Sequence, residues 1–317
     1  MKTVVITGGN SGLGYACARE IATQENWQIV LACRDLAKAE GAATRIKQET
    51  QCDRLEVMRL DLADLASIRT FCVELRDRDL PPLNAIVCNA GVQFVQQQTY
   101  TKDGLETTFG VNHLGHFLLV NLLLSQLVTP ARIVVVSSDT HDRRKTTGMP
   151  EPYFRTPHLM AHPQEDPALN NKKIGELGRI AYTTSKLCNL LFAYELDRRL
   201  QQQKIDSINV NVFNPGLMPG SGLAQDYAPA AKFVWHNILP ILSRFVPNVN
   251  TIDNAGKALA RLVLDPDLDD VSGKYFSGFE EIDSSEDSYD RAMAEQLWDG
   301  SIELTQLKDN ESILITK

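Results

Sequence analysis

The sequence lacks the features that several classes of protein require. Basic residues are in the minority, with 32 Lys and Arg against 40 Asp and Glu, so the 317-residue chain carries a formal charge of −8. Such a chain is poorly suited to wrapping nucleic acid, because that affinity depends on neutralising phosphates. No uninterrupted apolar run reaches the roughly 20 residues that span a bilayer. We therefore expect neither a nucleic-acid partner nor a transmembrane segment.

Cysteine and histidine are also sparse and poorly arranged for metal binding. None of the six cysteines forms a CxxC pair, and several lie in apolar runs, which is typical of buried, reduced thiols. His113 and His116 have no cysteine or carboxylate partner at ligand spacing, so no metal site is expected. Met1 and Lys2 lead directly into an apolar run without a signal-peptide pattern. A soluble, cytoplasmic protein is expected, with contact at a membrane surface left open.

Short β-branched runs alternate with longer segments of helical spacing. This alternation predicts an α/β fold, a single Rossmann-type domain with a doubly wound parallel sheet of about seven strands and helices on both faces. The expected strands are Thr3–Thr7, Gln28–Cys33, Leu55–Leu60, Ala85–Cys88, Arg132–Ser137, Ser207–Phe213 and Gly273–Phe276. The expected helices are Gly12–Thr23, Leu36–Glu49, Leu65–Arg78, Gly104–Leu127, Tyr182–Gln202 and Met293–Leu307.

Three segments depart from this alternation within the single domain 1–317. Residues 139–181 are rich in Pro, His, Asn and Lys, and a loop of this length is usually functional, so they are interpreted as an insertion. Residues 218–251 contain a strongly apolar stretch, interpreted as a lid over an apolar substrate. Residues 280–317 are interpreted as an exposed acidic tail followed by a final helix. The substrate contacts expected from the lid are Phe233, Trp235 and Leu239.

A glycine-rich turn follows the first expected strand and opens the first helix. Its spacing is G-x-x-x-G-x-G, and glycines there allow a tight turn and a close approach of the backbone to a pyrophosphate. The free N–H groups of the following helix would bind the phosphate oxygens. The dinucleotide contacts predicted from this turn are Gly8, Asn10, Ser11, Gly12, Leu13 and Gly14.

The end of the second strand indicates which dinucleotide is preferred. A carboxylate there would bind a ribose 2′-hydroxyl, but Cys33 and Arg34 occupy this place and Lys38 follows one helical turn later. A guanidinium matches a 2′-phosphate in shape and charge. Asp35 is expected to cap the next helix. The pattern therefore favours NADP(H) over NAD(H).

Further cofactor contacts are expected where other strands end, because ligands of open α/β sheets bind at the carboxyl ends of the strands. Asp61 and Leu62 follow the third strand, where a carboxylate would accept from the adenine amine. Asn89, Ala90 and Gly91 follow the fourth, and their small side chains would let the backbone lie against a ribose.

Tyr182 and Lys186 stand four residues apart on one face of an expected helix. A neighbouring ammonium and the positively charged nicotinamide ring would lower the tyrosine pKa from about 10 towards working pH. Tyr182 could then act as general acid or base at a carbonyl oxygen. Ser138, at the end of the fifth strand, would bond the same oxygen, and Asn112 would hold a water that links Lys186 to solvent.

Taken in order, these motifs resemble the short-chain dehydrogenase/reductase family over residues 1–278. The resemblance implies a catalytic tetrad of Asn112, Ser138, Tyr182 and Lys186, with Tyr182 and Lys186 also contacting the cofactor. It also implies that the turn Pro215, Gly216 and Leu217 lies beside the nicotinamide carboxamide.

A narrower resemblance is to the retinol dehydrogenase branch and to light-dependent protochlorophyllide reductase. It rests on Leu31–Asp35, Asn112–Phe117 and Tyr182–Asn189. The reductase carries a cysteine after its Pro-Gly pair, where Leu217 stands here, and usually a threonine at the position of Ser138. The retinol dehydrogenase-like interpretation is therefore preferred, and the N-terminal anchor of many retinol dehydrogenases is expected to be absent.

The resulting hypothesis is an NADP(H)-dependent oxidoreductase for a bulky, apolar carbonyl or alcohol such as a retinoid-like aldehyde. One alternative is a reductase of a tetrapyrrole double bond, and another is a non-catalytic NADPH sensor or scaffold. Helices such as Gly104–Leu127 and Tyr182–Gln202 form dimer faces in related proteins, so a homodimer stays open, although the insertion and the lid could block it.

Overall fold

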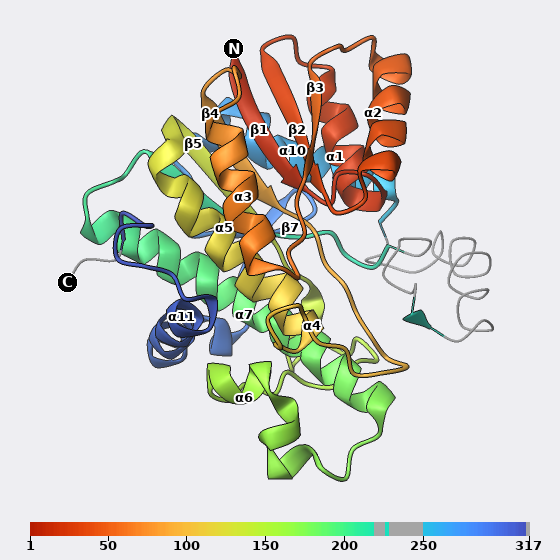
Figure 1. The fold of residues 1–317 in the computed structure, drawn as a ribbon, viewed down its shortest axis with the longest axis vertical. Coiled ribbons are helices and arrows are strands. Elements are labelled where there is room, and N and C mark those ends of the chain that lie inside the picture. The colour runs from red at the N-terminus through yellow and green to blue at the C-terminus, as the bar shows by residue number, and fades with distance from the viewer. Residues whose placement is uncertain (219–225, 228–249, 315–317) are drawn as a thin grey trace.

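A computed structural model describes residues 1–218, 226–227 and 250–314, and Figure 1 shows their arrangement. At its centre lies an eight-stranded sheet with the order β3-β2-β1-β4-β5-β6-β7-β8. Strands β1 to β7 pair in parallel and β8 pairs antiparallel with β7. The strands are β1 Lys2–Thr7, β2 Trp27–Cys33, β3 Leu55–Arg59, β4 Leu83–Cys88, β5 Leu127–Val136, β6 Ile208–Asn214, β7 Tyr275–Ser277 and β8 Glu280–Ile282.

Helices cover both faces of this sheet. Because the strands are buried on both faces, their sequences are continuous apolar runs. On one face α1, α2 and α10 pack around Ile6, Leu31 and Val87. On the other, α3, α5 and α7 pack around Val5, Ile86 and Val135. The predicted Rossmann-type doubly wound fold is thus confirmed. These helices are α1 Gly12–Ala22, α2 Leu36–Thr50, α3 Leu65–Arg76, α5 Gly115–Leu123, α7 Ile174–Gln202 and α10 Ile252–Leu264.

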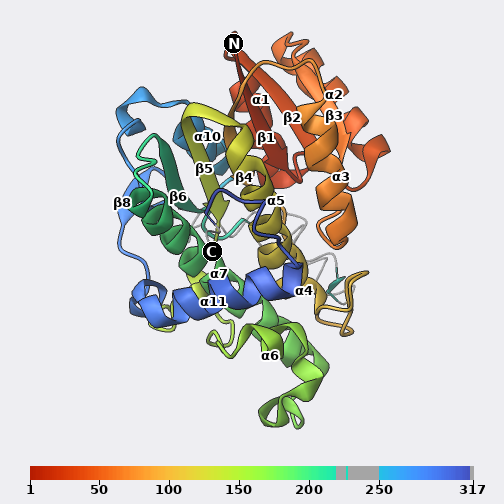
Figure 2. The ribbon, with the colours of Figure 1, turned by 60° about the vertical axis from the view of Figure 1, so that its left-hand side comes forward.

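The last helix, α11 (Arg291–Thr305), crosses the outer side of α5 and α7 (Figure 2). The Trp298 ring packs against Phe117 of α5 at 5.0 Å and Phe192 of α7 at 6.1 Å, measured between ring centroids. Because this surface of α5 and α7 is covered by the chain's own α11, it is not free to pair with a second copy. Among the described residues no helix is long and apolar enough to cross a membrane.

The C-terminal segment differs from the expected exposed tail. Residues Glu280–Ile282 form strand β8, because the turn at Gly278, with φ of +59°, returns the chain beside β7. The side chains of Ser284, Ser285 and Ser288 are buried. Arg143 pairs with Asp287 and joins this segment to the residues after β5. The acidic side chains mark an exposed edge, but the backbone belongs to the folded domain.

Two expected helices also have different bounds. The predicted helix Gly104–Leu127 is divided into α4 (Thr107–Phe109), a π-helical turn (Gly110–Leu114), α5 and a short 3-10 turn. The helix that carries Tyr182 begins earlier than predicted, at Ile174. Within the expected insertion the structure places the short helix α6 (Pro157–Ala161). Most of the proposed lid, including Phe233, Trp235 and Leu239, lies outside the described residues.

Candidate active site

The strand order brings four chain segments together at one edge of the sheet. The chain winds outward through β1, β2 and β3 and then returns to place β4 on the other side of β1. A crevice opens at the carboxyl ends of strands where the order reverses in this way. The segments after β1, β4, β5 and β6 therefore meet there, and they carry most of the predicted site residues.

The glycine turn has the backbone that its sequence predicts. Gly8 and Gly12 have φ of +66° and +55°, a region that side chains with a Cβ rarely adopt. A Cβ on Gly14 would lie 2.6 Å from the carbonyl oxygen of Gly8, so only glycine fits where α1 crosses the turn. Nothing lies within 4 Å of a Cβ built on Gly12, and the Ser11 side chain makes no capping bond. The first N–H groups of α1 thus have no capping bond from Ser11, which leaves them available to a pyrophosphate.

Asn89, at the end of β4, holds this turn in place. Its side-chain Nδ2 donates to the carbonyl oxygen of Thr7 at 2.8 Å. The backbone N–H groups of Asn89 and Ala90 donate to the Thr7 hydroxyl, both at 2.9 Å. Asn89 therefore orders the glycine turn from behind, a role that differs from the ribose contact expected of Asn89–Gly91.

The end of β2 presents Arg34 as the sequence predicts. Its side chain is exposed and makes no hydrogen bond or ion pair with the described residues, so it is free for a phosphate ligand. Lys38 is exposed too, and its Nζ lies 3.3 Å from the Asp35 carboxylate. Asp35 caps α2 as expected, accepting from the Lys38 backbone N–H at 3.1 Å. The Cys33 thiol lies against the N–H groups of Gly8, Gly9 and Asn10, although burial raises its pKa to about 11.

Two further predicted cofactor contacts lie at the ends of β3 and β6. Asp61 accepts from the Ala63 backbone N–H at 3.0 Å, and Leu62 lies so close to α5 that a Cβ on Gly115 would be 2.7 Å from its carbonyl oxygen. Gly216 has φ of +74°, and its N–H donates to the Asn214 side chain at 3.0 Å. The Leu217 side chain is 47% exposed. Both turns are thus fixed by the protein itself.

Tyr182, Lys186 and Ser138 come together between α7 and the end of β5. The Lys186 ammonium lies 5.5 Å from the centre of the Tyr182 ring and donates to the Val136 carbonyl oxygen at 3.3 Å. The Ser138 side chain lies close enough to the Tyr182 phenol to act against the rise of its pKa. Ser137 Oγ donates to the Lys186 carbonyl oxygen at 2.8 Å, which joins α7 to β5. The neighbouring serines therefore differ, since Ser138 faces the phenol while Ser137 supports the helix.

In the protein without cofactor, the pKa of Tyr182 is raised and not lowered as expected. Burial raises the pKa of Tyr182 well above its usual value, against a smaller lowering by the Ser138 hydrogen bond. Burial also lowers the pKa of Lys186 to about 8. Without the charge of an oxidised nicotinamide, desolvation of a phenolate outweighs attraction to one ammonium. The site thus holds Tyr182 as a neutral phenol, the form that donates a proton.

Asn112 lies in the π-helical turn, a geometry that is common at functional sites. Its Oδ1 accepts from the Val92 N–H at 2.8 Å, while Nδ2 donates to the Val92 carbonyl and to Ser185 Oγ, both at 3.0 Å. With its side-chain amide engaged in this way, Asn112 ties the segment after β4 to α7. A relay water would therefore have to bind to a group other than the two N–H donors of this amide.

His116 is a residue whose role the sequence interpretation missed. Its ring is buried, its Nδ1 lies 3.1 Å from the Asn112 carbonyl oxygen, and its Nε2 lies 2.9 Å from the Thr7 hydroxyl. His113, three residues earlier, instead bonds Ser301 of α11 at 2.9 Å. From the sequence, no metal site is expected at these two histidines, and no further role is assigned to them. His116 lies in α5, two residues after the π-helical turn, which no local sequence pattern signals.

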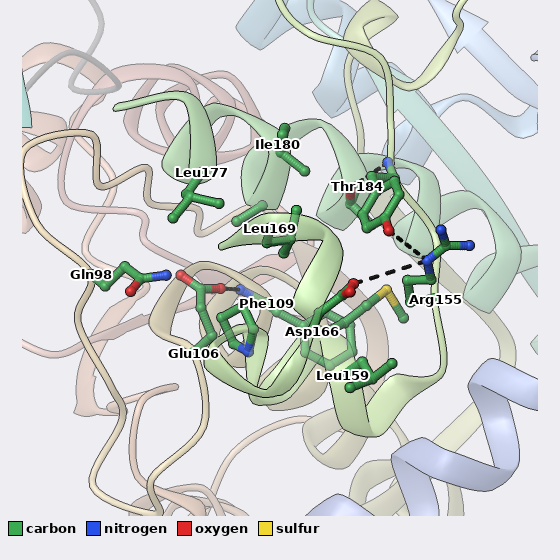
Figure 3. Close-up of a pocket in the computed structure, with 14 residues that line it drawn as sticks. Gln98, Glu106, Phe109, Arg155, Leu159, Asp166, Leu169, Leu177, Ile180 and Thr184 are labelled. Carbon is green, nitrogen blue, oxygen red and sulfur yellow. Dashed lines mark hydrogen bonds and ion pairs between the residues drawn. The ribbon is translucent and has the colours of Figure 1, made fainter. Parts of the chain in front are cut away.

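A small cavity lies on another face of α7, beneath the insertion (Figure 3). Leu177, Ile180 and Thr184 of α7 line one side of it, and Leu169 and Asp166 of the insertion line another. Its volume is about 50 Å³, little more than one or two waters occupy. A bulky substrate does not fit there, so this cavity is not the substrate site.

Comparisons with known proteins agree with this geometry. The family model of the short chain dehydrogenases matches residues 2–149. Retinol dehydrogenase 14 of Mus musculus is 36% identical over 94% of this chain and 84% of its own length. Chloroplastic protochlorophyllide reductase of Daucus carota is 33% identical over 96% of this chain and 78% of its own.

A solved structure gives the same result for the fold. An uncharacterised protein from Mycobacterium Paratuberculosis superposes with a TM-score of 0.68 and 29% identity, covering 96% of this chain and 93% of that one. The chain is therefore an oxidoreductase that belongs to the short-chain dehydrogenase family.

Proposed function

We propose that the protein is an NADP(H)-dependent reductase of bulky, apolar carbonyl compounds, with Tyr182 as the proton donor. The observation that carries this proposal is the buried Tyr182 phenol, which lies beside Ser138 and has the Lys186 ammonium 5.5 Å from its ring centre. A phenol held in this way can protonate an oxygen that becomes negatively charged. The reverse reaction, oxidation of an alcohol, would use the same groups.

The residues at the sheet edge fit a nicotinamide dinucleotide. The open cradle at Gly12, the free N–H groups of α1 and the unpaired Arg34 guanidinium would hold its pyrophosphate and 2′-phosphate. Lys186 Nζ lies 3.7 Å from a Cβ built on Gly91, so the ammonium reaches the place where a ribose would lie. When bound, this cofactor supplies the hydride.

The chain's own groups would then control the carbonyl oxygen. Ser138 Oγ and the Tyr182 hydroxyl would bond this oxygen together, orienting it and favouring the charge that develops on it. Tyr182 would pass its proton to the oxygen, and the Lys186 ammonium would stabilise the phenolate that remains. Because burial lowers the pKa of Lys186 to about 8, this ammonium gives up its proton more readily than an exposed lysine does.

The substrate class is inferred from the apolar composition of residues 218–251 and from the similar proteins. A retinol dehydrogenase and a protochlorophyllide reductase, both named for large apolar substrates, are among the similar proteins. Reduction of a tetrapyrrole double bond is the second candidate, supported by the second of these relatives. Leu217 offers no proton beside the Pro-Gly turn, which favours the carbonyl reaction.

One screen tests both candidates. NADPH oxidation is measured with retinal, other apolar aldehydes, steroids and protochlorophyllide, the last in the dark and in the light. We expect turnover of apolar aldehydes and none of protochlorophyllide. Rapid conversion of the pigment confined to the light would favour the second candidate. Tight NADPH binding without turnover of any compound would favour a sensor or scaffold instead.

A further inference from the structure

Gln93 is a buried side chain that the proposed reaction does not yet use. It is 4% exposed, and its Oε1 accepts from the Tyr227 hydroxyl at 3.1 Å. Its Nε2, which carries two N–H donors, has no hydrogen-bond partner among the residues that the structure describes. A buried donor without a partner lowers the stability of the folded protein. Such a group in a native protein therefore points to a partner such as a ligand or a water.

The backbone on either side places Gln93 at the catalytic group. Val92, the preceding residue, is bonded through both its N–H and its carbonyl to the side chain of Asn112. Phe94, the following residue, lies against α7 at Gly178, where a Cβ would be only 1.8 Å from the Phe94 carbonyl oxygen. Gly178 precedes Tyr182 by four residues and so shares its face of the helix. Gln93 is therefore held between Asn112 and the Tyr182 face of α7.

Tyr227 connects Gln93 to Tyr182 from the other side. The Asp226 carboxylate accepts from the N–H groups of Val95 and Gln96 at 2.7 and 2.8 Å, which anchors Tyr227 over the segment after β4. The phenol of Tyr227 is close enough to raise the pKa of Tyr182. Because the Tyr227 hydroxyl fixes Oε1, the opposite end of the carboxamide, Nε2, is held in one direction.

We propose that Gln93 is a substrate-binding residue whose Nε2 donates a hydrogen bond to a substrate oxygen other than the reacting carbonyl. The substrates would then be apolar carbonyl compounds with a second acceptor, such as an ester or ketone oxygen. This inference rests on the proposed function, since it assigns a specificity to the same site. A site built to bond a polar group discriminates strongly against analogues that lack it, because its own donor is left unpaired.

Matched aldehydes test this specificity by equilibrium binding. Methyl 3- and 4-formylbenzoate carry an ester oxygen, and 3- and 4-isopropylbenzaldehyde have a similar shape without it. Dissociation constants are measured on protein saturated with NADP⁺, in which neither aldehyde can be reduced. We expect the wild type to bind at least one ester more tightly than its matched alkyl compound. Gln93→Leu should raise the Kd for that ester about 10-fold and leave the Kd for the alkyl compound unchanged.

Two further variants serve as controls. Gln97→Leu makes the same change at an exposed glutamine of this segment and should alter neither affinity. Gln93→Glu keeps the shape but removes the donor, so it should lose the ester preference even if Gln93→Leu fails to fold. NADP⁺ affinity should be unchanged in each folded variant. The proposal would be overturned if the wild type bound the matched aldehydes equally well. It would also be overturned if Gln93→Leu weakened the binding of both aldehydes by the same factor.

The same preparations separate this inference from the proposed function. Turnover of 3- and 4-isopropylbenzaldehyde with NADPH reports carbonyl reduction without the second oxygen. Turnover without an ester preference would contradict only the role of Gln93. An ester preference in the NADP⁺ complex without any turnover would support the contact and contradict the reductase.

Discussion

His116 Nε2 lies 2.9 Å from the hydroxyl oxygen of Thr7, and this contact joins the catalytic turn to the cofactor turn. Burial lowers the pKa of His116 to about 4, so its ring is neutral near pH 7. The Asn112 carbonyl oxygen can only accept, so His116 Nδ1 carries the proton and Nε2 accepts from the Thr7 hydroxyl. The Thr7 oxygen in turn accepts from Asn89 and Ala90.

The first prediction concerns this hydroxyl. Thr7→Val keeps the shape but leaves the Ala90 N–H and His116 Nε2 unpaired, while the Asn89 N–H keeps its bond to the Val87 carbonyl oxygen. This change should lower the free energy of unfolding by about 1–3 kcal/mol. It should also weaken NADPH binding, because the glycine turn loses its support. Thr7→Ser retains the hydroxyl and should lose much less stability and much less NADPH affinity. Urea unfolding and NADPH fluorescence titration measure the two effects, and equal losses in both variants would contradict this role.

A second prediction concerns stability at mildly acidic pH. Burial lowers the pKa values of His113 and His116 to about 3 and about 4, whereas unfolded histidine titrates near 6.5. As the pH falls below 6.5, these two histidines become protonated in the unfolded chain but stay neutral in the folded protein. The free energy of unfolding therefore decreases. The loss by pH 5 is about 2 kcal/mol for each histidine.

Urea unfolding at pH 7 and pH 5 measures this effect. His116→Gln should have a shallower pH dependence than the wild type, whatever its stability at pH 7. His158→Gln, at an exposed histidine, should keep the wild-type slope. An unchanged slope in His116→Gln would show that this histidine is not held neutral.

The third prediction concerns cofactor choice. Arg34→Leu should raise the Kd for NADPH by about 10- to 150-fold and leave that for NADH nearly unchanged, because a charge-assisted bond to a 2′-phosphate contributes roughly 1.5–3 kcal/mol. Arg76→Leu removes an exposed arginine distant from the sheet edge and serves as the control. A wild type that binds both cofactors equally would contradict the assignment.

The sequence predicts the parts of this site that depend on local backbone chemistry. The turn at Gly8–Gly14, the cap at Asp35 and the mostly parallel sheet follow from glycine placement, cap chemistry and apolar runs, and the structure has all three. The π-helical turn at Gly110–Leu114 does not follow, because no local sequence pattern distinguishes it from an ordinary helical turn. Strand β8 was missed since Glu280–Ile282 is short and acidic and pairs only at an edge.

Side-chain roles were the least predictable feature. The Asn112 amide is bonded to Val92 and Ser185, residues that are distant in sequence, so no local pattern predicts these contacts. The pKa of Tyr182 depends on burial by the whole fold, which no motif encodes. Gln93 carries no motif at all, and its position becomes evident only when Val92 and Phe94 are seen against Asn112 and α7.

The fourth prediction concerns assembly. Helix α11 covers α5 and α7 through Trp298, so pairing of two copies through this surface would require α11 to move away. We therefore expect a monomer, and light scattering coupled to gel filtration should give the mass of one chain. A mass of two chains at micromolar concentration would contradict this expectation and would point to a different dimer surface.

The central claim is that Tyr182 donates the proton, and a paired measurement on Tyr182→Phe tests it most directly. The substitution keeps the buried ring but removes the hydroxyl, so the NADPH Kd should stay near the wild-type value. The kcat for an aldehyde that the wild type reduces should fall by about 10²- to 10⁴-fold, as expected for loss of general acid catalysis. Both are measured on one preparation, by NADPH fluorescence and NADPH absorbance. A wild-type kcat in Tyr182→Phe would contradict the account.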